Sequence, residues 1–69
     1  MSLAESLKKA EKLIDVAIVN VHKVYVPVIC NVGVKEAIRR LEAAIESLEK
    51  AIQLLVFVLD KVKQARKNE

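Results

Sequence analysis

The chain has 69 residues, of which 54% are hydrophobic and 30% charged, and it carries a formal net charge of +3. This length allows one small domain, and this hydrophobic content excludes a disordered chain. A single cysteine cannot form an intrachain disulfide, and the residue pattern offers no ligand set for a structural metal. Because one core rarely stabilises fewer than about 70–80 residues, the composition predicts that copies of the chain associate with one another.

Residues 3–25 are predicted to form the first helix. Ser2 and Glu5 have the spacing of a capping box, in which the serine side chain accepts a backbone hydrogen bond near the glutamate. Beyond this start, apolar residues recur at alternating spacings of four and three residues, the period of a supercoiled helical seam. They are Leu3, Leu7, Ala10, Ile14, Ala17, Val21 and Val24.

The alternative for this segment is a β-strand over residues 16–28, which are rich in β-branched side chains. Strict alternation would place Asn20 and His22 on one face of such a strand and Lys23 on the other. Neither face would be apolar, so the helix is favoured. It is predicted to end just before Pro27, because the residue that precedes a proline disfavours helical geometry.

Residues 26–33 are predicted to form a turn of unusual composition. The stretch VYVPVICNVGV, residues 24–34, holds the chain's only proline, glycine and cysteine, yet eight of its eleven residues are apolar. Turns normally run over the surface, where polar residues suit them. The composition therefore predicts that something outside the hairpin covers this turn. Within it, Cys30 is expected to be a small buried apolar residue, with an interchain disulfide as the alternative.

The longest predicted element is a helix over residues 34–67. Glu36 in its first turn and Lys67 in its last have the charges that the helix dipole favours at those ends. Large apolar residues keep the spacing of four and three over four heptads. They are Val34, Ile38, Leu41, Ile45, Leu48, Ile52, Leu55, Leu59 and Val62.

With Ile38 as heptad position a, small residues fill most g positions of this helix. The g residues are Ala37, Ala44, Ala51, Val58 and Ala65. A stripe of a, d and g positions faces more than one neighbouring helix. Two helices joined by a short connection pack antiparallel, and two such hairpins form a four-helix bundle. The predicted fold is all-α: one domain, residues 1–69, in which an antiparallel hairpin of a short and a long helix assembles as a homodimeric four-helix bundle.

The unequal lengths of the two helices predict where the second copy lies. The second helix is expected to overhang the first from Phe57 onward, near the apolar run LLVFVL at residues 54–59. Two hairpins with their turns at opposite ends would lay each overhang across the partner's turn, in a C2 interface. The predicted dimer interface consists of Val24, Tyr25, Val28, Ile29, Cys30, Leu54, Leu55, Phe57, Val58 and Leu59.

Catalytic groups are scarce in this sequence. His22 is the only histidine, and Asp15 on the same helix face lies about 10 Å away, too far to orient it. Ser2 is assigned to the cap, whereas Ser6 and Ser47 are expected on the helix surface. One glycine cannot build a phosphate-binding loop. No catalytic, cofactor-binding or metal-ligating residue is predicted, and the chain is not expected to be an enzyme.

Binding of nucleic acid is the second hypothesis, because basic residues gather at the ends of both helices away from the turn. They are Lys8, Lys9, Lys12, Lys61, Lys63, Arg66 and Lys67. Tyr25 and Phe57 are both expected to be structural, so the stacking platforms typical of single-strand binding are missing. Acidic neighbours such as Glu5 and Asp60 dilute the patch, which favours a solvated helix end over a nucleic-acid site.

The expected function is that of a small non-enzymatic protein that self-associates and acts as a protein–protein interaction or adaptor module. The alternative is a nucleic-acid-binding regulator. A cytoplasmic location is expected, because an unpaired cysteine suits a reducing compartment and no apolar run reaches the about 18 residues of a membrane span. Val16, Ile18 and Val19 make the first helix apolar nearly all round, which suggests a further contact with another dimer or another protein.

Overall fold

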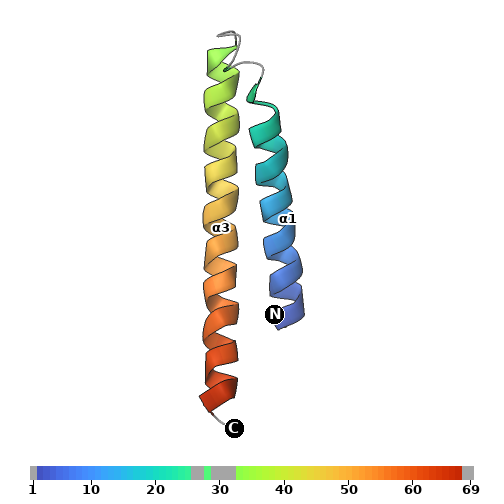
Figure 1. Ribbon diagram of the computed structural model, residues 1–69, viewed down its shortest axis with the longest axis vertical. Coiled ribbons are helices and arrows are strands. Elements are labelled where there is room, and N and C mark those ends of the chain that lie inside the picture. Colours follow the sequence, from blue (N-terminus) through green and yellow to red (C-terminus); the bar gives the residue numbers. More distant parts are fainter. Residues whose placement is uncertain (1, 26–27, 29–32, 68–69) are drawn as a thin grey trace.

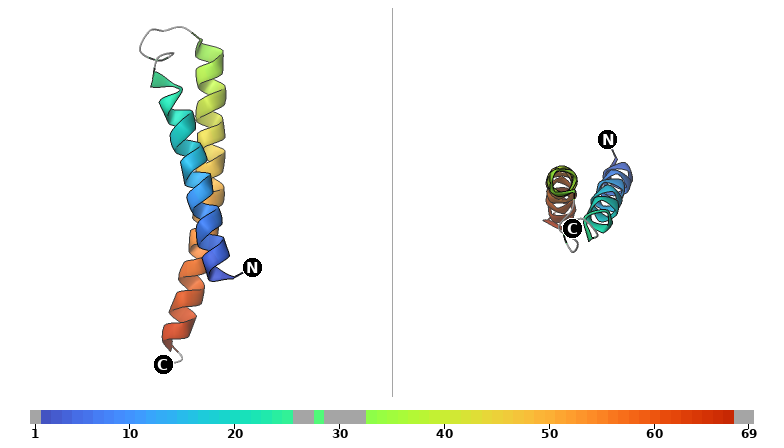
Figure 2. Two further views of the ribbon diagram at one scale, coloured as in Figure 1. Left: turned by 90° about the vertical axis from the view of Figure 1, so that its right-hand side faces the viewer. Right: turned by 90° about the horizontal axis from the view of Figure 1, so that it is seen from above.

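The structure, a computed structural model, describes residues 2–25, 28 and 33–67 and contains an antiparallel pair of helices. Helix α1 spans Leu3–His22 and helix α3 spans Val34–Lys67. The two lie side by side and run in opposite directions (Figures 1 and 2). They form a thin rod whose Cα atoms extend over 56 × 15 × 15 Å. The predicted helical hairpin is thereby confirmed.

The observed bounds agree with the sequence prediction for one helix and differ from it for the other. Helix α3 begins and ends where the four-three pattern placed it, whereas α1 ends at His22 rather than just before Pro27. The alternative strand over residues 16–28 is wrong for its described part up to His22, which is helical. Within the described ranges, neither helix has a stretch long and apolar enough to cross a membrane.

Local hydrogen bonds explain where each helix begins. The Ser2 side chain accepts a hydrogen bond from the Glu5 backbone N–H at 3.1 Å, as the N-cap of α1. Gly33 precedes α3 with a φ of 64°, a left-handed conformation that glycine adopts without steric cost. Its carbonyl accepts the Ala37 N–H at 3.0 Å, which starts the backbone ladder of α3. Most of the predicted turn lies outside the described residues.

The helices contact each other along a seam of mostly small side chains. On α3 the buried residues are Ala37, Ala44, Ala51 and Val58, which are the g positions as far as Val58. On α1 and just after it they are Ser6, Ala10, Ala17, Asn20 and Val24. Small side chains let helix axes come close together. The hairpin is therefore closed by alanine layers rather than by the large apolar residues at positions a and d.

The point at which α3 leaves α1 differs from the sequence prediction. Val58 is only 9% exposed and is the last buried residue of α3, so the overhang starts after it and not at Phe57. Figure 1 shows α3 continuing past the start of α1. Of the apolar run at residues 54–59, only Leu59 lies beyond this point. The overhang is consequently shorter and more charged than the sequence suggested.

Ser6 corrects another expectation. The sequence predicts a surface position for it, yet Ser6 is 1% exposed and lies in the seam. Within the described part of the chain its hydroxyl oxygen has no hydrogen-bond partner. Ser6 precedes Ala10 by four residues and Ala17 by eleven, so it continues the seam of α1 by one turn. Its small size suits this position, whereas its polarity does not.

Candidate functional site

Large apolar side chains cover one long side of the hairpin, which we call the apolar face. Its α3 half consists of Val34, Ile38, Leu41, Ile45, Leu48, Ile52, Leu55, Leu59 and Val62. Its α1 half consists of Leu3, Leu7, Ile14, Ile18, Val21 and, just after the helix, Tyr25. Apart from the half-buried Ile14, these side chains are between 37% and 58% exposed. A single hairpin therefore leaves most of its large apolar residues in contact with water.

A shallow hollow joins the two halves of the apolar face. It has a volume of about 310 Å³ and is lined by Leu48 from α3 and by Ile14, Ala17, Ile18 and Val21 from α1, with His22 and Tyr25 at one edge. The His22 and Tyr25 rings meet edge to face, with centroids 5.6 Å apart. Because residues from both helices line one hollow, Leu48 of α3 lies beside large residues of α1. The other a and d positions share the side of α3 on which Leu48 lies.

Charged side chains border the apolar face rather than interrupt its α3 half. The e positions of α3 flank this half: Lys35, Glu42, Glu49 and Lys63 are charged and exposed, and the exposed Val56 is the one apolar residue among them. An apolar centre with a charged rim is the arrangement found in protein–protein interfaces. On the α1 side, Glu11 is the exposed residue between Leu7 and Ile14.

The opposite side of the hairpin, which we call the polar face, carries a hollow of different character. It has a volume of about 470 Å³ and is lined by Lys9 and Leu13 of α1 and by Lys50, Gln53 and Leu54 of α3. Another hollow on this face, about 290 Å³, is lined by Asp15, Val16, Val19, Asn20 and Arg40. The polar face thus places apolar pairs, Leu13 with Leu54 and Val16 with Val19, among charged and polar side chains.

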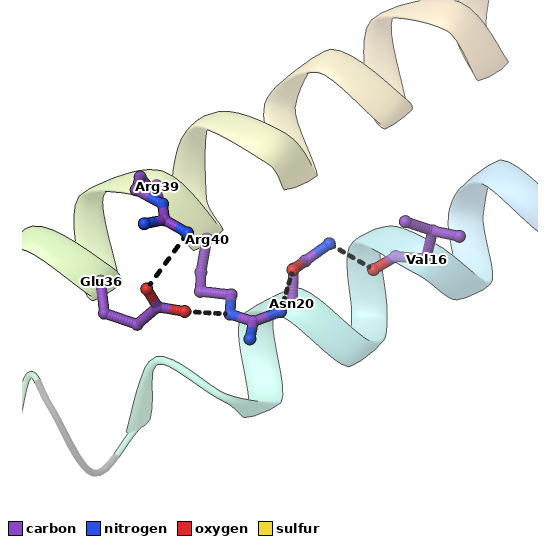
Figure 3. A network of polar contacts seen from close by, with 5 residues as sticks. All are labelled: Val16, Asn20, Glu36, Arg39 and Arg40. Carbon is purple, nitrogen blue, oxygen red and sulfur yellow. Dashed lines mark hydrogen bonds and ion pairs between the residues drawn. The ribbon is translucent and has the colours of Figure 1, made fainter.

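A polar network joins α1 to α3 near the turn end of the hairpin (Figure 3). The Asn20 amide nitrogen donates to the Val16 carbonyl at 3.0 Å, and its oxygen accepts from Arg40 Nη1 at 3.3 Å. Arg40 Nε in turn donates to Glu36 Oε1 at 2.9 Å, and Arg39 lies 3.7 Å from the other Glu36 oxygen. Asn20 is 8% exposed, so this network supplies the partners that a buried amide needs.

Neither Asn20 nor Arg40 is among the functional residues predicted from the sequence. A signal for Asn20 was nevertheless present, because it lies three residues after Ala17 and four before Val24. A polar residue at seam spacing marks either an error in the pattern or a residue with a buried partner.

The predicted dimer-interface residues fall on three parts of the structure. Leu55, Leu59 and Tyr25 belong to the apolar face, and Val28 is also exposed. Val24 and Val58 are buried in the seam of their own hairpin. Phe57 follows Gln53 by four residues and Lys50 by seven, so it belongs to the polar face together with Leu54. Ile29 and Cys30 lie outside the described residues.

The further contact predicted for Val16, Ile18 and Val19 is split between the two faces of the hairpin. Ile18 lines the hollow of the apolar face, whereas Val16 and Val19 line a hollow of the polar face. They therefore do not form one patch. Only Ile18 shares a surface with the large apolar residues of α3.

The predicted basic contacts are spread over two helices. Lys8, Lys9 and Lys12 line one hollow of about 300 Å³ together with Glu5. In the overhang, the Lys61 ammonium lies 5.6 Å from the centre of the Phe57 ring, a cation–π contact within α3. Lys63, Arg66 and Lys67 are exposed on the same helix. Acidic residues are interspersed, and a nucleic-acid contact stays a prediction.

Among residues 2–25, 28 and 33–67, no group of three or more His, Cys, Asp or Glu side chains could hold a metal ion. The chain matches no protein-family model, no curated protein and no solved structure. Its function has to be inferred from its surfaces, and the apolar face is the candidate functional site.

Proposed function

We propose that this chain is a non-enzymatic, self-associating helical hairpin in which the apolar face of one copy packs against that of a second copy. The product is a homodimeric four-helix bundle. The observation that carries this proposal is the difference in burial between heptad positions of α3. The g positions close the hairpin, while the a and d positions stay exposed. A seam of alanine layers leaves the larger apolar surface for association.

Burial of this surface is large enough to favour association. Fully burying one large apolar side chain contributes about 1.5–3 kcal/mol, so covering the exposed half of each contributes roughly 1 kcal/mol. The fifteen side chains of the apolar face then contribute on the order of 15 kcal/mol per protomer. Association costs about 4–15 kcal/mol. The free energy gained by burial in two protomers exceeds this cost of association, which supports a stable dimer.

A second copy of this chain fits the apolar face better than an unrelated partner. The a and d residues of α3 keep helical heptad spacing over its whole length, and such a stripe packs best against a helix of the same period. A C2 dimer supplies that helix from the same surface. Self-association also explains how so short a chain, with alanines as its main buried apolar residues, stays folded.

We place the turns of the two hairpins at opposite ends of the bundle. In this arrangement α3 packs antiparallel against α3 of the partner, and every neighbouring pair of helices is antiparallel. The overhang, with Leu59 and Val62 exposed, then extends towards the turn end of the partner. The correction at Val58 shortens the overhang but does not remove these two residues from the apolar face.

The biological role we propose is that of an interaction or adaptor module. A bundle sealed along the apolar faces would present two copies of the polar face on its outside, each with Lys9, Leu13, Lys50 and Leu54 around a hollow. The outer surface is thus available for contact with other proteins while the dimer stays intact.

A matched pair of substitutions tests the proposed face. Leu48→Glu places a carboxylate in the centre of the apolar face, and Gln53→Glu places the same group on the polar face. We expect Leu48→Glu to give a molecule of single-chain mass in light scattering, because the dimer would bury an unpaired charge. Gln53→Glu should keep the mass of two chains. Equal masses for both variants would contradict the assignment of the face.

A further inference from the structure

The alanine seam has a weakness: its repeat does not define the axial position of one helix against the other. Ala10 and Ala17 are seven residues apart, as are Ala37, Ala44 and Ala51. Sliding α1 by one heptad, about 10.5 Å at 1.5 Å per residue, would again place alanine against alanine. Similar layers at several offsets favour register slippage.

The contact between Asn20 and Arg40 distinguishes the observed register from the slipped ones. In the observed register Asn20 meets Arg40 at 3.3 Å. From this contact and the burial of both alanines we infer that Ala17, one turn from Asn20, lies near Ala44, one turn from Arg40. After a slip of one heptad towards the C-terminal end of α3, Asn20 would face Ser47. The buried amide would then exchange the charged guanidinium for the short, neutral Ser47 hydroxyl, and its oxygen would lose the stronger, charge-assisted hydrogen bond.

Arg40 is itself held in position for this contact. Its Nε donates to Glu36 Oε1 at 2.9 Å, one helical turn earlier, while its Nη1 reaches across to Asn20. The fixed fork of the guanidinium lets it serve two acceptors at once. A glutamate one turn away thus directs a long, flexible side chain towards the opposite helix.

We propose that Asn20 and Arg40 are specificity-determining residues that select one axial register of the hairpin. A single buried polar residue in an apolar helical seam acts in this way when mismatched registers offer it a weaker partner or none. The register also sets how much of α3 extends beyond α1, and hence the shape that the apolar face offers to a second copy. This last consequence rests on the proposed dimer, whereas the selection of the register does not.

Intramolecular disulfides test the register directly. With Cys30→Ser as background, Ala17→Cys combined with Ala44→Cys reports the observed register, and Ala17→Cys combined with Ala51→Cys reports the slipped one. Facing alanines in a close seam suit the Cβ separation of a disulfide, about 3.5–4.5 Å. Under dilute oxidation we expect the first pair to link at least 10-fold faster than the second.

Substitutions at Asn20 then separate specificity from stability. Asn20→Leu should bring the two rates within about 2-fold while the melting temperature stays the same or rises, because an apolar residue suits every register. Asn20→Asp should restore the 10-fold preference, since its carboxylate accepts from Arg40. If Asn20→Leu keeps the full preference for the first pair, the proposal is wrong.

The outcome can be told apart from that of the proposed dimer. The disulfides are internal, so they are read at single-chain mass and can be formed on the Leu48→Glu background as well. A monomeric wild-type chain would contradict the proposed dimer, whereas the disulfide test of the register would remain valid. If the wild-type chain is a dimer but its Asn20→Leu variant keeps one register, the proposed role of Asn20 is wrong and the proposed dimer stands.

Discussion

Ala44 and Ile45 are neighbours in the sequence, yet Ala44 is 3% exposed in the seam and Ile45 is 55% exposed on the apolar face. The smaller side chain closes the hairpin and the larger one faces water. This inversion recurs every heptad along α3, at Ala37 and Ile38 and again at Ala51 and Ile52. This pattern supports the proposed role of the large residues in association.

Enlarging an alanine in the seam should separate the helices. Ala44→Leu adds a bulky side chain where the structure has no room, and we expect a loss of about 1–3 kcal/mol in the free energy of unfolding. Ala65→Leu is the matched control, because Ala65 is also a g position but lies exposed in the overhang. Urea unfolding followed by circular dichroism measures both. Equal destabilisation by the two variants would argue against an alanine seam.

Removing the buried hydroxyl of Ser6 should stabilise the hairpin. Its oxygen is buried without a partner in the described part of the chain, and Ser6→Ala relieves that cost, a gain of about 1 kcal/mol in unfolding free energy. Ser2→Ala should have the opposite sign and cost about 0.5–2 kcal/mol, because it removes the cap of α1. Thermal melts of the two variants check the signs. A loss of stability in Ser6→Ala would show that its hydroxyl is satisfied.

Two neighbouring residues in the apolar run at 54–59 should behave differently in the dimer. Leu55 belongs to the apolar face and Phe57 to the polar face, although both are 41% exposed. Leu55→Ser should cost about 1 kcal/mol in each of two symmetric copies, roughly a 30-fold weaker dimer. Phe57→Ser should leave the dissociation constant within a few-fold. Sedimentation equilibrium measures both constants, and a larger effect at Phe57 would restore the interface expected from the sequence.

Cysteines near the ends of α3 report the orientation of the second copy. With Cys30→Ser as background, Ile38→Cys and Val62→Cys are prepared as separate chains; both sites are on the apolar face. Antiparallel packing of α3 against its partner predicts that a mixture links 38 to 62 between chains. Hairpins with their turns at the same end would place α3 against α1 of the partner and give no such product. Mass spectrometry of the cross-linked species distinguishes the two.

The sequence predicted the elements well because helical periodicity is local information. The four-three spacing and the charges at its ends located α3, and the Ser2 cap located the start of α1. The end of α1 was placed too late. The helix ends at His22, and the Val24 N–H then bonds the Val21 carbonyl at 3.1 Å, an i→i+3 contact that heptad spacing does not predict.

The pairing of faces was harder to predict, because heptad spacing identifies a stripe but not its partner. Positions g and a both carry apolar residues on α3, and the pattern alone does not say which of them faces α1. The structure resolves this through size, since small side chains allow the closer approach. Ser6 was misplaced for the same reason, because a small polar residue in an alanine seam looks like a surface residue in the sequence.

The most direct test of this account is the mass of the wild-type chain in solution. Light scattering coupled to size exclusion, at protein concentrations from 1 µM to 100 µM (on the order of common interface affinities), compares the measured mass with the 7.7 kDa of one chain. We predict a mass of two chains over most of this range, with retained helicity. A chain that stays at single mass, and is fully helical at the highest concentration, would contradict the assignment of the apolar face as a dimer interface.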